Sequence, residues 1–135
     1  MNLQRKLASM ALAGGLAVSG LAATATPASA VGGCDSDQLC LYRSTNFRTM
    51  ALETTRTFDC WELIEYGLTY PWNGISSYVN NLPFKATLWE RSGSLWLEAA
   101  TIRSGGSSSN STTHYGFTHS EYICTGGADP RDFFS

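Results

Sequence analysis

Past residue 30, the chain alternates short apolar and β-branched stretches with clusters of turn residues. One strand is predicted to begin at Leu39, Leu41 and Tyr42, and its return strand runs from Arg48 to Glu53 after a turn at 46–47. Further strands are expected at 76–80, 85–90, Leu95–Glu98 and Glu121–Cys124, and the Thr-rich stretch from Thr54 to Trp61 is also β-prone. Short strands at this spacing are typical of a sandwich and not of a helical or α/β domain. The pattern predicts an all-β fold.

Two stretches depart from the strand pattern. Trp61 to Tyr66 has a helical character, and Gly67 would end it after a turn or two. Residues 104–113 consist almost entirely of Ser, Gly, Thr and Asn, which is the composition of a flexible loop.

A unit between Trp72 and Trp89 organises the predicted fold. It contains a turn at Asn73-Gly74, the pair Ser76-Ser77, a strand, a second turn at 80–83 and an aromatic-ended strand at 86–89. Asn and Gly tolerate the positive φ of such turns, and serine hydroxyls bond nearby backbone groups. The chain before this unit holds a first copy of it, so the sequence predicts a repeated β unit.

Residues 1–30 are predicted to be a cleaved export signal. Arg5 and Lys6 supply a positive head, an uncharged apolar run follows from Leu7 to Leu21, and Ala28-Ser29-Ala30 is a small-x-small cleavage site. The apolar run is shorter than a membrane span needs, and glycines interrupt it. We expect a secreted protein with no membrane anchor.

The expected mature chain, residues 31–135, is long enough for one domain. Without Arg5 and Lys6, seven basic residues stand against eleven acidic ones, so the net charge is −4. Nucleic acids and anionic membranes require Lys/Arg patches, and no basic cluster is present in this sequence. The charge pattern disfavours both partners.

The four cysteines, Cys34, Cys40, Cys60 and Cys124, all lie in the expected mature chain. An even number in a small exported domain predicts two disulfides, although four cysteines allow three connectivities. Cys34 and Cys40 are close enough to close a short turn, in which case Cys60 and Cys124 would tie the middle of the chain to its end. Zinc is the rival reading, but the chain has no Cys-x-x-Cys knuckle.

Several of these features together resemble a known family. Cys34-x5-Cys40-Leu41-Tyr42-x4-Phe47 is similar to the opening of a βγ-crystallin Greek key, and 73–77 (Asn-Gly-Ile-Ser-Ser) resembles that family's Asn/Asp-x-x-Ser-Ser turn. With the signal peptide, the whole resembles the secreted bacterial metalloproteinase inhibitors of crystallin-like fold, over about residues 34–91. The resemblance implies a Greek-key β-sandwich of two units, roughly 38–82 and 84–126, in which Tyr42 packs over Phe47 across a folded hairpin.

The departures from the family pattern shape the expectations about ligands. Thr49 stands where the family has a glycine, so the hairpin is expected to relax or adopt another turn. In crystallins two turns share a calcium ion, to which Asn73, the Ile75 carbonyl and the Ser76 hydroxyl could contribute here. With no carboxylate in this turn and no clear second turn, we expect calcium binding to be weak or absent and the turn to be structural.

The function implied by the resemblance is inhibition of an extracellular protease, a metalloproteinase above all, by a rigidly presented loop of a monomer. The family closes its reactive loop with a Cys-x4-Cys bridge, which this chain lacks. The substitute loops are Ser92-Gly93-Ser94, the segment 104–120, and residues 80–84 with Leu82 and Pro83.

Other function classes remain open on the sequence. A non-inhibitory extracellular module for calcium, sugar or protein would use exposed tryptophans among Trp61, Trp72, Trp89 and Trp96, although we expect at least two of these to be buried. A secreted antimicrobial protein is a third class. Catalysis is not expected, because the two histidines and the scattered carboxylates form no known catalytic motif.

Overall fold

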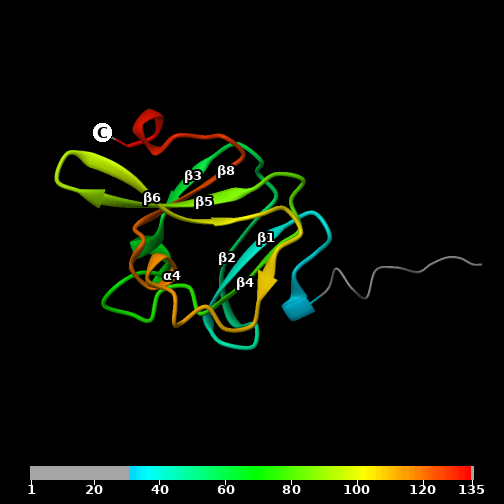
Figure 1. The fold of residues 1–135 in the computed structure, drawn as a ribbon. Helices are drawn as coiled ribbons and strands as arrows, with labels where there is room; N and C mark the ends of the chain where they lie inside the picture. The colour runs from blue at the N-terminus through cyan, green and yellow to red at the C-terminus, as the bar shows by residue number, and fades with distance from the viewer. Residues whose placement is uncertain (1–30, 135) are drawn as a thin grey trace, which may run out of the picture. The chain divides into compact units, whose positions relative to one another are not determined.

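Residues 31–134 are described by a computed structural model, and they form two four-stranded antiparallel sheets (Figure 1). The predicted export signal, residues 1–30, lies outside the described residues. The strands are β1 (Leu39–Ser44), β2 (Arg48–Thr54), β3 (Cys60–Glu62), β4 (Ser77–Asn80), β5 (Ala86–Ser92), β6 (Leu95–Ile102), β7 (Ser107–Ser108) and β8 (Tyr122–Thr125). The all-β prediction is confirmed.

Helical segments are short and lie before, between and after the strands. They are η3 (Val31–Gly33), η4 (Leu63–Tyr66), α4 (Tyr115–His119) and η5 (Pro130–Asp132). Gly67 caps η4 with φ 68°, as the sequence predicted, whereas α4 had no signal in the sequence. Within residues 31–134, no helix has the length and apolar character needed to cross a membrane.

The first half of the chain, β1 to β4, and the second half, β5 to β8, exchange one strand each. The sheet orders are β2-β1-β4-β7 and β3-β8-β5-β6, so β3 leaves the first half to pair with β8, and β7 leaves the second half to pair with β4. Figure 1 shows β3 beside β8, and the short unlabelled arrow of β7 beside β4. Neither half can complete its sheet without the other.

The β1–β2 and β5–β6 hairpins also have a register shift at corresponding positions. In the β1–β2 pair the register shifts between Leu41 and Tyr42, and in the β5–β6 pair it shifts between Leu88 and Trp89. Tyr42 faces Ser77 across β1 and β4, while Trp89 faces Tyr122 across β5 and β8. Tyr42 and Trp89 therefore occupy corresponding positions.

The β1–β2 hairpin folds over the aromatic pair that the sequence predicted. Tyr42 and Phe47 meet edge to face with ring centroids 5.8 Å apart, and the hydroxyl of Ser77 donates to the Ser44 carbonyl at 2.6 Å while accepting the Phe47 N–H at 3.0 Å. The expectation for Thr49 was wrong. Thr49 itself adopts a positive φ, of 62°, and its hydroxyl lies 3.2 Å from that of Ser44.

The Ser-rich segment 104–113 is fixed to the sheet, so its prediction as a flexible loop was wrong. Residues 107–108 form β7, Ser109 accepts the Asn46 N–H at 2.8 Å, and the Ser111 N–H donates to Ser76 at 2.9 Å. The prediction for 54–61 was too long, because only its two ends are in strands, Thr54 in β2 and Cys60–Trp61 in β3. The backbone groups of the Ser-rich segment find partners in β4 and the first hairpin, which the composition alone does not reveal.

Apolar side chains from both sheets fill the space between them. Leu41, Leu52, Leu88 and Ile123 are at the centre of this core, which also takes in Phe117 of α4. Two smaller clusters each join a disulfide to one of the corresponding aromatics, Cys34–Cys40 with Tyr42 and Cys60–Cys124 with Trp89. The sandwich therefore has a central core and two sulfur–aromatic clusters beside it.

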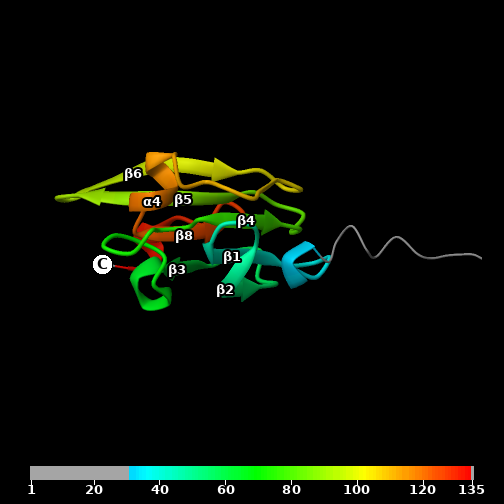
Figure 2. The same cartoon turned by 90° about the horizontal axis from the view of Figure 1, so that it is seen from below.

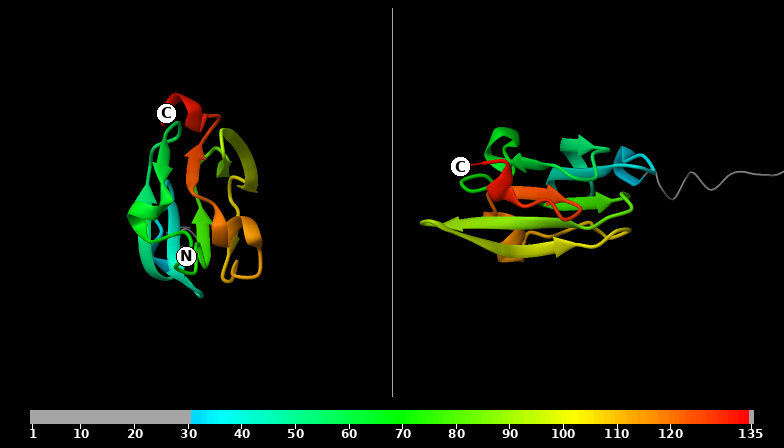
Figure 3. Two further views of the ribbon diagram at one scale, coloured as in Figure 1. Left: turned by 90° about the vertical axis from the view of Figure 1, so that its left-hand side faces the viewer. Right: turned by 90° about the horizontal axis from the view of Figure 1, so that it is seen from above.

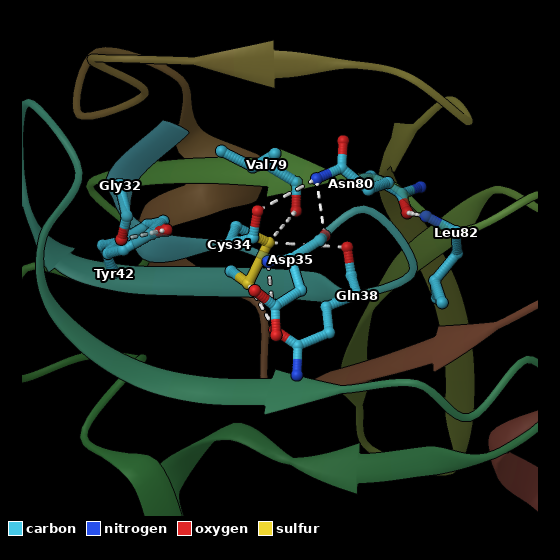
Figure 4. The surroundings of a disulfide bond; sticks show 10 residues. Gly32, Cys34, Asp35, Gln38, Tyr42, Val79, Asn80 and Leu82 are labelled. Atoms are coloured by element: carbon cyan, nitrogen blue, oxygen red, sulfur yellow. Dashed lines mark hydrogen bonds between the residues drawn. A yellow bond between two sulfur atoms is a disulfide. The ribbon is translucent and has the colours of Figure 1, made fainter. Parts of the chain in front are cut away.

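Both disulfides form, and their connectivity pairs the closely spaced Cys34 and Cys40, which the sequence had left as one of three possibilities. They are Cys34–Cys40 and Cys60–Cys124, and no cysteine in residues 31–134 is free. Around the first bond, the Tyr42 hydroxyl donates to the Gly32 carbonyl at 3.0 Å, and the Asp35 N–H donates to the side chain of Gln38 at 3.3 Å (Figure 4). The disulfide prediction is confirmed, and zinc ligation by the cysteines is excluded.

Removing the second disulfide is expected to cost more stability than removing the first. The loops span 64 and 6 residues, so the chain-entropy model gives about 4 kcal/mol for Cys60–Cys124 and about 2 kcal/mol for Cys34–Cys40. Urea unfolding of the two double-alanine variants measures the difference. Equal losses would show that packing in the two clusters, and not loop length, decides the effect.

Candidate functional site

The turn at 73–77 connects the two halves and is largely enclosed. Ile75 is fully buried and Ser76 nearly so, while Asn73 is exposed. The Ile75 N–H donates to the Phe117 carbonyl at 2.8 Å, and the Ile75 carbonyl accepts the Ser111 hydroxyl at 2.6 Å. This turn therefore holds α4 and the Ser-rich segment in place.

One of the three predicted calcium ligands, the Ile75 carbonyl, already has a hydrogen-bond partner. The Ile75 carbonyl already has the Ser111 hydroxyl as its donor, so an ion there would have to displace that hydroxyl. Within residues 31–134, no three side chains of His, Cys, Asp or Glu are grouped so that they could hold a metal. Calcium binding at this turn is still expected to be weak or absent. The hydrogen bonds of the turn are those of a structural connection.

The predicted inhibitory loops differ in their exposure. Ser92, Gly93 and Ser94 form the exposed tip of the β5–β6 hairpin. Leu82 is 1% exposed, and its carbonyl accepts the Ser104 hydroxyl at 2.5 Å, while the neighbouring Pro83 is exposed. The Ser-rich segment is held along β4, as described above.

The β5–β6 hairpin projects beyond the other strands at the end of the sandwich that carries α4 (Figure 2), and the views in Figure 3 agree. β6 is the last strand of its sheet, and its side chains Leu95 and Leu97 are 62% and 45% exposed. On the opposite side of the hairpin, the Arg91 guanidinium lies 4.6 Å from the centre of the Trp96 ring. The tip is thus exposed on a hairpin that is paired along its whole length.

An open cleft of about 590 Å³ lies beside this hairpin, and sequence reasoning did not find it. Four segments line it: β3–η4 and its extension to Tyr70, the end of the β5–β6 hairpin, α4, and the start of β8. Its polar and aromatic lining consists of Glu62, Thr69, Tyr70, Glu90, Arg91, Tyr115, His119, Glu121 and Tyr122. We refer to it as the acidic aromatic cleft.

Three rings form a stack along the cleft. His119 lies 4.2 Å from Tyr115 and 5.8 Å from Tyr70, centroid to centroid, and all three planes are within 12° of parallel. The hydroxyl of Thr118 lies 2.7 Å from His119 Nδ1. Tyr70 and Tyr115 remain 69% and 60% exposed. The chain therefore presents two tyrosines to solvent on a ring stack that α4 supports.

Each of the three glutamates in the cleft is oriented by a donor. Tyr115 donates its hydroxyl to Glu90 at 3.1 Å, and Tyr122 donates to Glu62 at 3.4 Å. Glu121 accepts the backbone N–H of Arg91 at 3.0 Å. The pairing with Glu90 raises the pKa of Tyr115, and burial, with the charges of Glu62 and Glu121, raises the pKa of Tyr122.

The expectation that at least two tryptophans are buried was wrong. Trp89 alone, at 8% exposed, is in a core cluster, while Trp61 and Trp96 are partly buried and Trp72 is 52% exposed. Tyrosines, not tryptophans, form the aromatic surface of the cleft. The pair Glu121-Tyr122 was the sequence feature that indicated this surface. It occupies the position that Ser76-Ser77 has in the first half, with large polar and aromatic side chains in place of small ones.

Alanine is expected to be far more damaging at Gly74 than at Gly93. Both glycines have positive φ, which costs another residue about 1–2 kcal/mol. A Cβ at Gly74 would lie 2.4 Å from Thr118 Cα, whereas a Cβ at Gly93 meets nothing within 4 Å. We expect a loss of at least about 3 kcal/mol for Gly74→Ala. Urea unfolding gives both values, and similar losses would contradict the close approach of α4 to this turn.

Substituting Glu90 is expected to lower the pKa of Tyr115. The Glu90 carboxylate accepts a hydrogen bond from the Tyr115 hydroxyl and repels the negative charge of the phenolate. Both effects raise the pKa of Tyr115 above its ordinary value in the folded protein. Glu90→Gln keeps an acceptor and removes the charge, so Tyr115 should titrate at lower pH. NMR or ultraviolet titration measures it, with Glu53→Gln on β2 as the control that leaves Tyr115 unchanged.

Comparisons with known proteins add no relative to these observations. Neither a scan against protein-family models, nor a search of curated proteins, nor a search of solved structures gives a match. Membership of a family is therefore not shown.

Proposed function

We propose that this protein is a secreted proteinase inhibitor that presents the tip of its β5–β6 hairpin, Ser92-Gly93-Ser94, to an extracellular metalloproteinase. The observation that carries the proposal is the projection of this exposed tip from a fully paired hairpin. Loops held in one conformation bind without the entropy cost of ordering them. Two disulfides are typical of proteins that work in an oxidising compartment, which supports export.

The proposed architecture is a crystallin-like pair of Greek keys. Three features favour it: each half gives one strand to the other sheet, both hairpins shift register at the same point, and Ser77 bridges the folded hairpin of the first half. In a Greek key the fourth strand returns beside the first, as β4 lies beside β1 and β8 beside β5. The resemblance that suggested inhibition rests on the same residues.

The hairpin is a better candidate for the inhibitory segment than the turn at Leu82-Pro83. An inhibitory residue must place its side chain in an enzyme pocket, and Leu82 is held in the core with its carbonyl already bonded. β6 adds a second advantage, because an exposed edge strand can pair with the extended chain of a partner. The exposed Leu95 and Leu97 would supply apolar contacts there.

A non-inhibitory extracellular binding module is the second candidate. The acidic aromatic cleft favours it, because exposed tyrosines beside oriented carboxylates form a ready recognition surface. Such a module would bind its ligand whether or not the protein affects any protease.

The disulfide-bonded protein is expected to inhibit a thermolysin-like metalloproteinase stoichiometrically. Ser94→Asp should weaken inhibition at least tenfold, because a carboxylate at the tip would enter the enzyme's cleft unpaired. Ser36→Asp makes the same change on another exposed turn and serves as the control. The measurement is the residual activity of the metalloproteinase on a small substrate, and the same assay is run with a subtilisin-like protease. Digestion of the protein as an ordinary substrate by both enzymes would refute the proposal.

A further inference from the structure

The acidic aromatic cleft has the chemistry of a receptor for a positively charged side chain. Its charged lining comprises three glutamates, Glu62, Glu90 and Glu121, and one arginine, Arg91. We propose that this cleft binds an arginine side chain presented by a peptide or protein partner. The inference does not depend on protease inhibition, since it uses the cleft and not the reactive tip.

The first support is the orientation of the carboxylates. Glu90, Glu62 and Glu121 each accept a hydrogen bond from the chain itself, from Tyr115, Tyr122 and the Arg91 backbone respectively. A carboxylate has about four acceptor positions, so one donor fixes its direction without filling it. Carboxylates fixed in this way bind a guanidinium with less loss of side-chain entropy.

The second support is the balance of charge. The three carboxylates of Glu62, Glu90 and Glu121 against the one guanidinium of Arg91 give these four groups a net charge of −2. The Arg91 guanidinium is stacked on Trp96, which also contacts Tyr122 edge to face. An excess of one sign in a concave site attracts ligands of the other sign. An anionic ligand is therefore disfavoured, and a cation is favoured.

The third support is the ring stack. Tyr70 and Tyr115 are mostly exposed, and His119 holds them nearly parallel. Guanidinium groups stack on aromatic faces and pair with carboxylates through two N–H groups at once, so arginine uses both parts of this lining. The Arg91–Trp96 contact in the same hairpin is an example of that stacking.

The cleft also adjoins the exposed hairpin. Gly93, the turn residue of the β5–β6 hairpin, belongs to its lining. A partner whose arginine occupies the cleft would thus have its neighbouring residues close to the hairpin tip. A peptide or protein surface, and not an isolated amine, matches a cleft that opens beside an exposed edge strand.

The test is an NMR titration of the ¹⁵N-labelled, disulfide-bonded protein with the capped tripeptide acetyl-Gly-Arg-Gly-amide. Its matched control is the same peptide with citrulline, which has nearly the shape of arginine and no charge. We expect the arginine peptide to shift the amide signals of Gly93, Tyr115, His119 and Glu121, with an affinity that falls as salt is added. The citrulline peptide should bind at least fivefold more weakly.

Variants locate the binding. Glu90→Gln and Glu121→Gln should each weaken the arginine peptide by about fivefold, because each removes a charge and keeps an acceptor. Glu53→Gln makes the same change on exposed β2 of the other sheet and should leave the affinity unchanged. Thermal melting confirms that each variant is folded.

Four outcomes would overturn the proposal. They are the absence of shifts, shifts that map away from the cleft, equal affinity for citrulline, and an equal effect of Glu53→Gln. A neutral trisaccharide of N-acetylglucosamine is included as a further probe. If it bound the cleft more tightly than the arginine peptide, the exposed rings would serve a sugar and the assignment to a cation would be wrong.

Discussion

The backbone N–H and carbonyl groups of two residues, Ser76 and Glu121, join the two halves of this protein, and the neighbouring strands are arranged around these bonds. Ser76 donates its N–H to Tyr42 of its own half at 3.0 Å, and its carbonyl accepts the Ser111 N–H of the other half at 2.9 Å. Glu121 repeats this at the corresponding place, donating to Trp89 at 2.9 Å and accepting from Leu63 at 2.8 Å. Since Tyr42, Leu63, Ser76 and Trp89 are buried, losing either bridge would leave buried polar atoms without partners. The exchanged strands β3 and β7 are held by the same two bridges, so both sheets depend on them.

The side chains at these two positions explain why the halves differ on the surface. In the first half the residue after the bridge is Ser77, which is small enough to turn inward and bond the folded hairpin through Ser44 and Phe47. In the second half the residue after the bridge is Tyr122, which is too large for that role and donates its hydroxyl to Glu62 instead. The β5–β6 hairpin is therefore not folded over its own half, and it projects as a straight arm (Figure 3). The space beneath the arm is the acidic aromatic cleft, so the projecting tip and the cleft have one structural origin.

This common origin relates the two proposed functions. The hairpin tip is formed by small residues on a rigid support, which suits insertion into the cleft of another protein. The acidic aromatic cleft is itself concave and negatively charged, which suits capture of a basic side chain. Gly93 of the hairpin tip lines the cleft, and the hairpin lies at the end of the sandwich away from η3 (Figure 1). One partner could engage both, with the disulfides and core keeping the two surfaces in fixed relation.

The sequence by itself determined the β class, the places of most strands and the turn at Asn73-Gly74, because alternation and turn chemistry are local properties. The number of cysteines predicted two disulfides but left their connectivity open, and the fold decided it. Only the tertiary structure decided the features that depend on contacts between distant residues. Thr49 accepts a strained positive φ inside the hairpin that Ser77 closes, and the Ser-rich segment is ordered by bonds to Asn46, Ser76 and β4. The cleft likewise gathers glutamates and tyrosines from four segments that are separate in the sequence and meet only in the folded chain. Local preference fixes the elements, whereas long-range pairing fixes which surfaces they leave exposed.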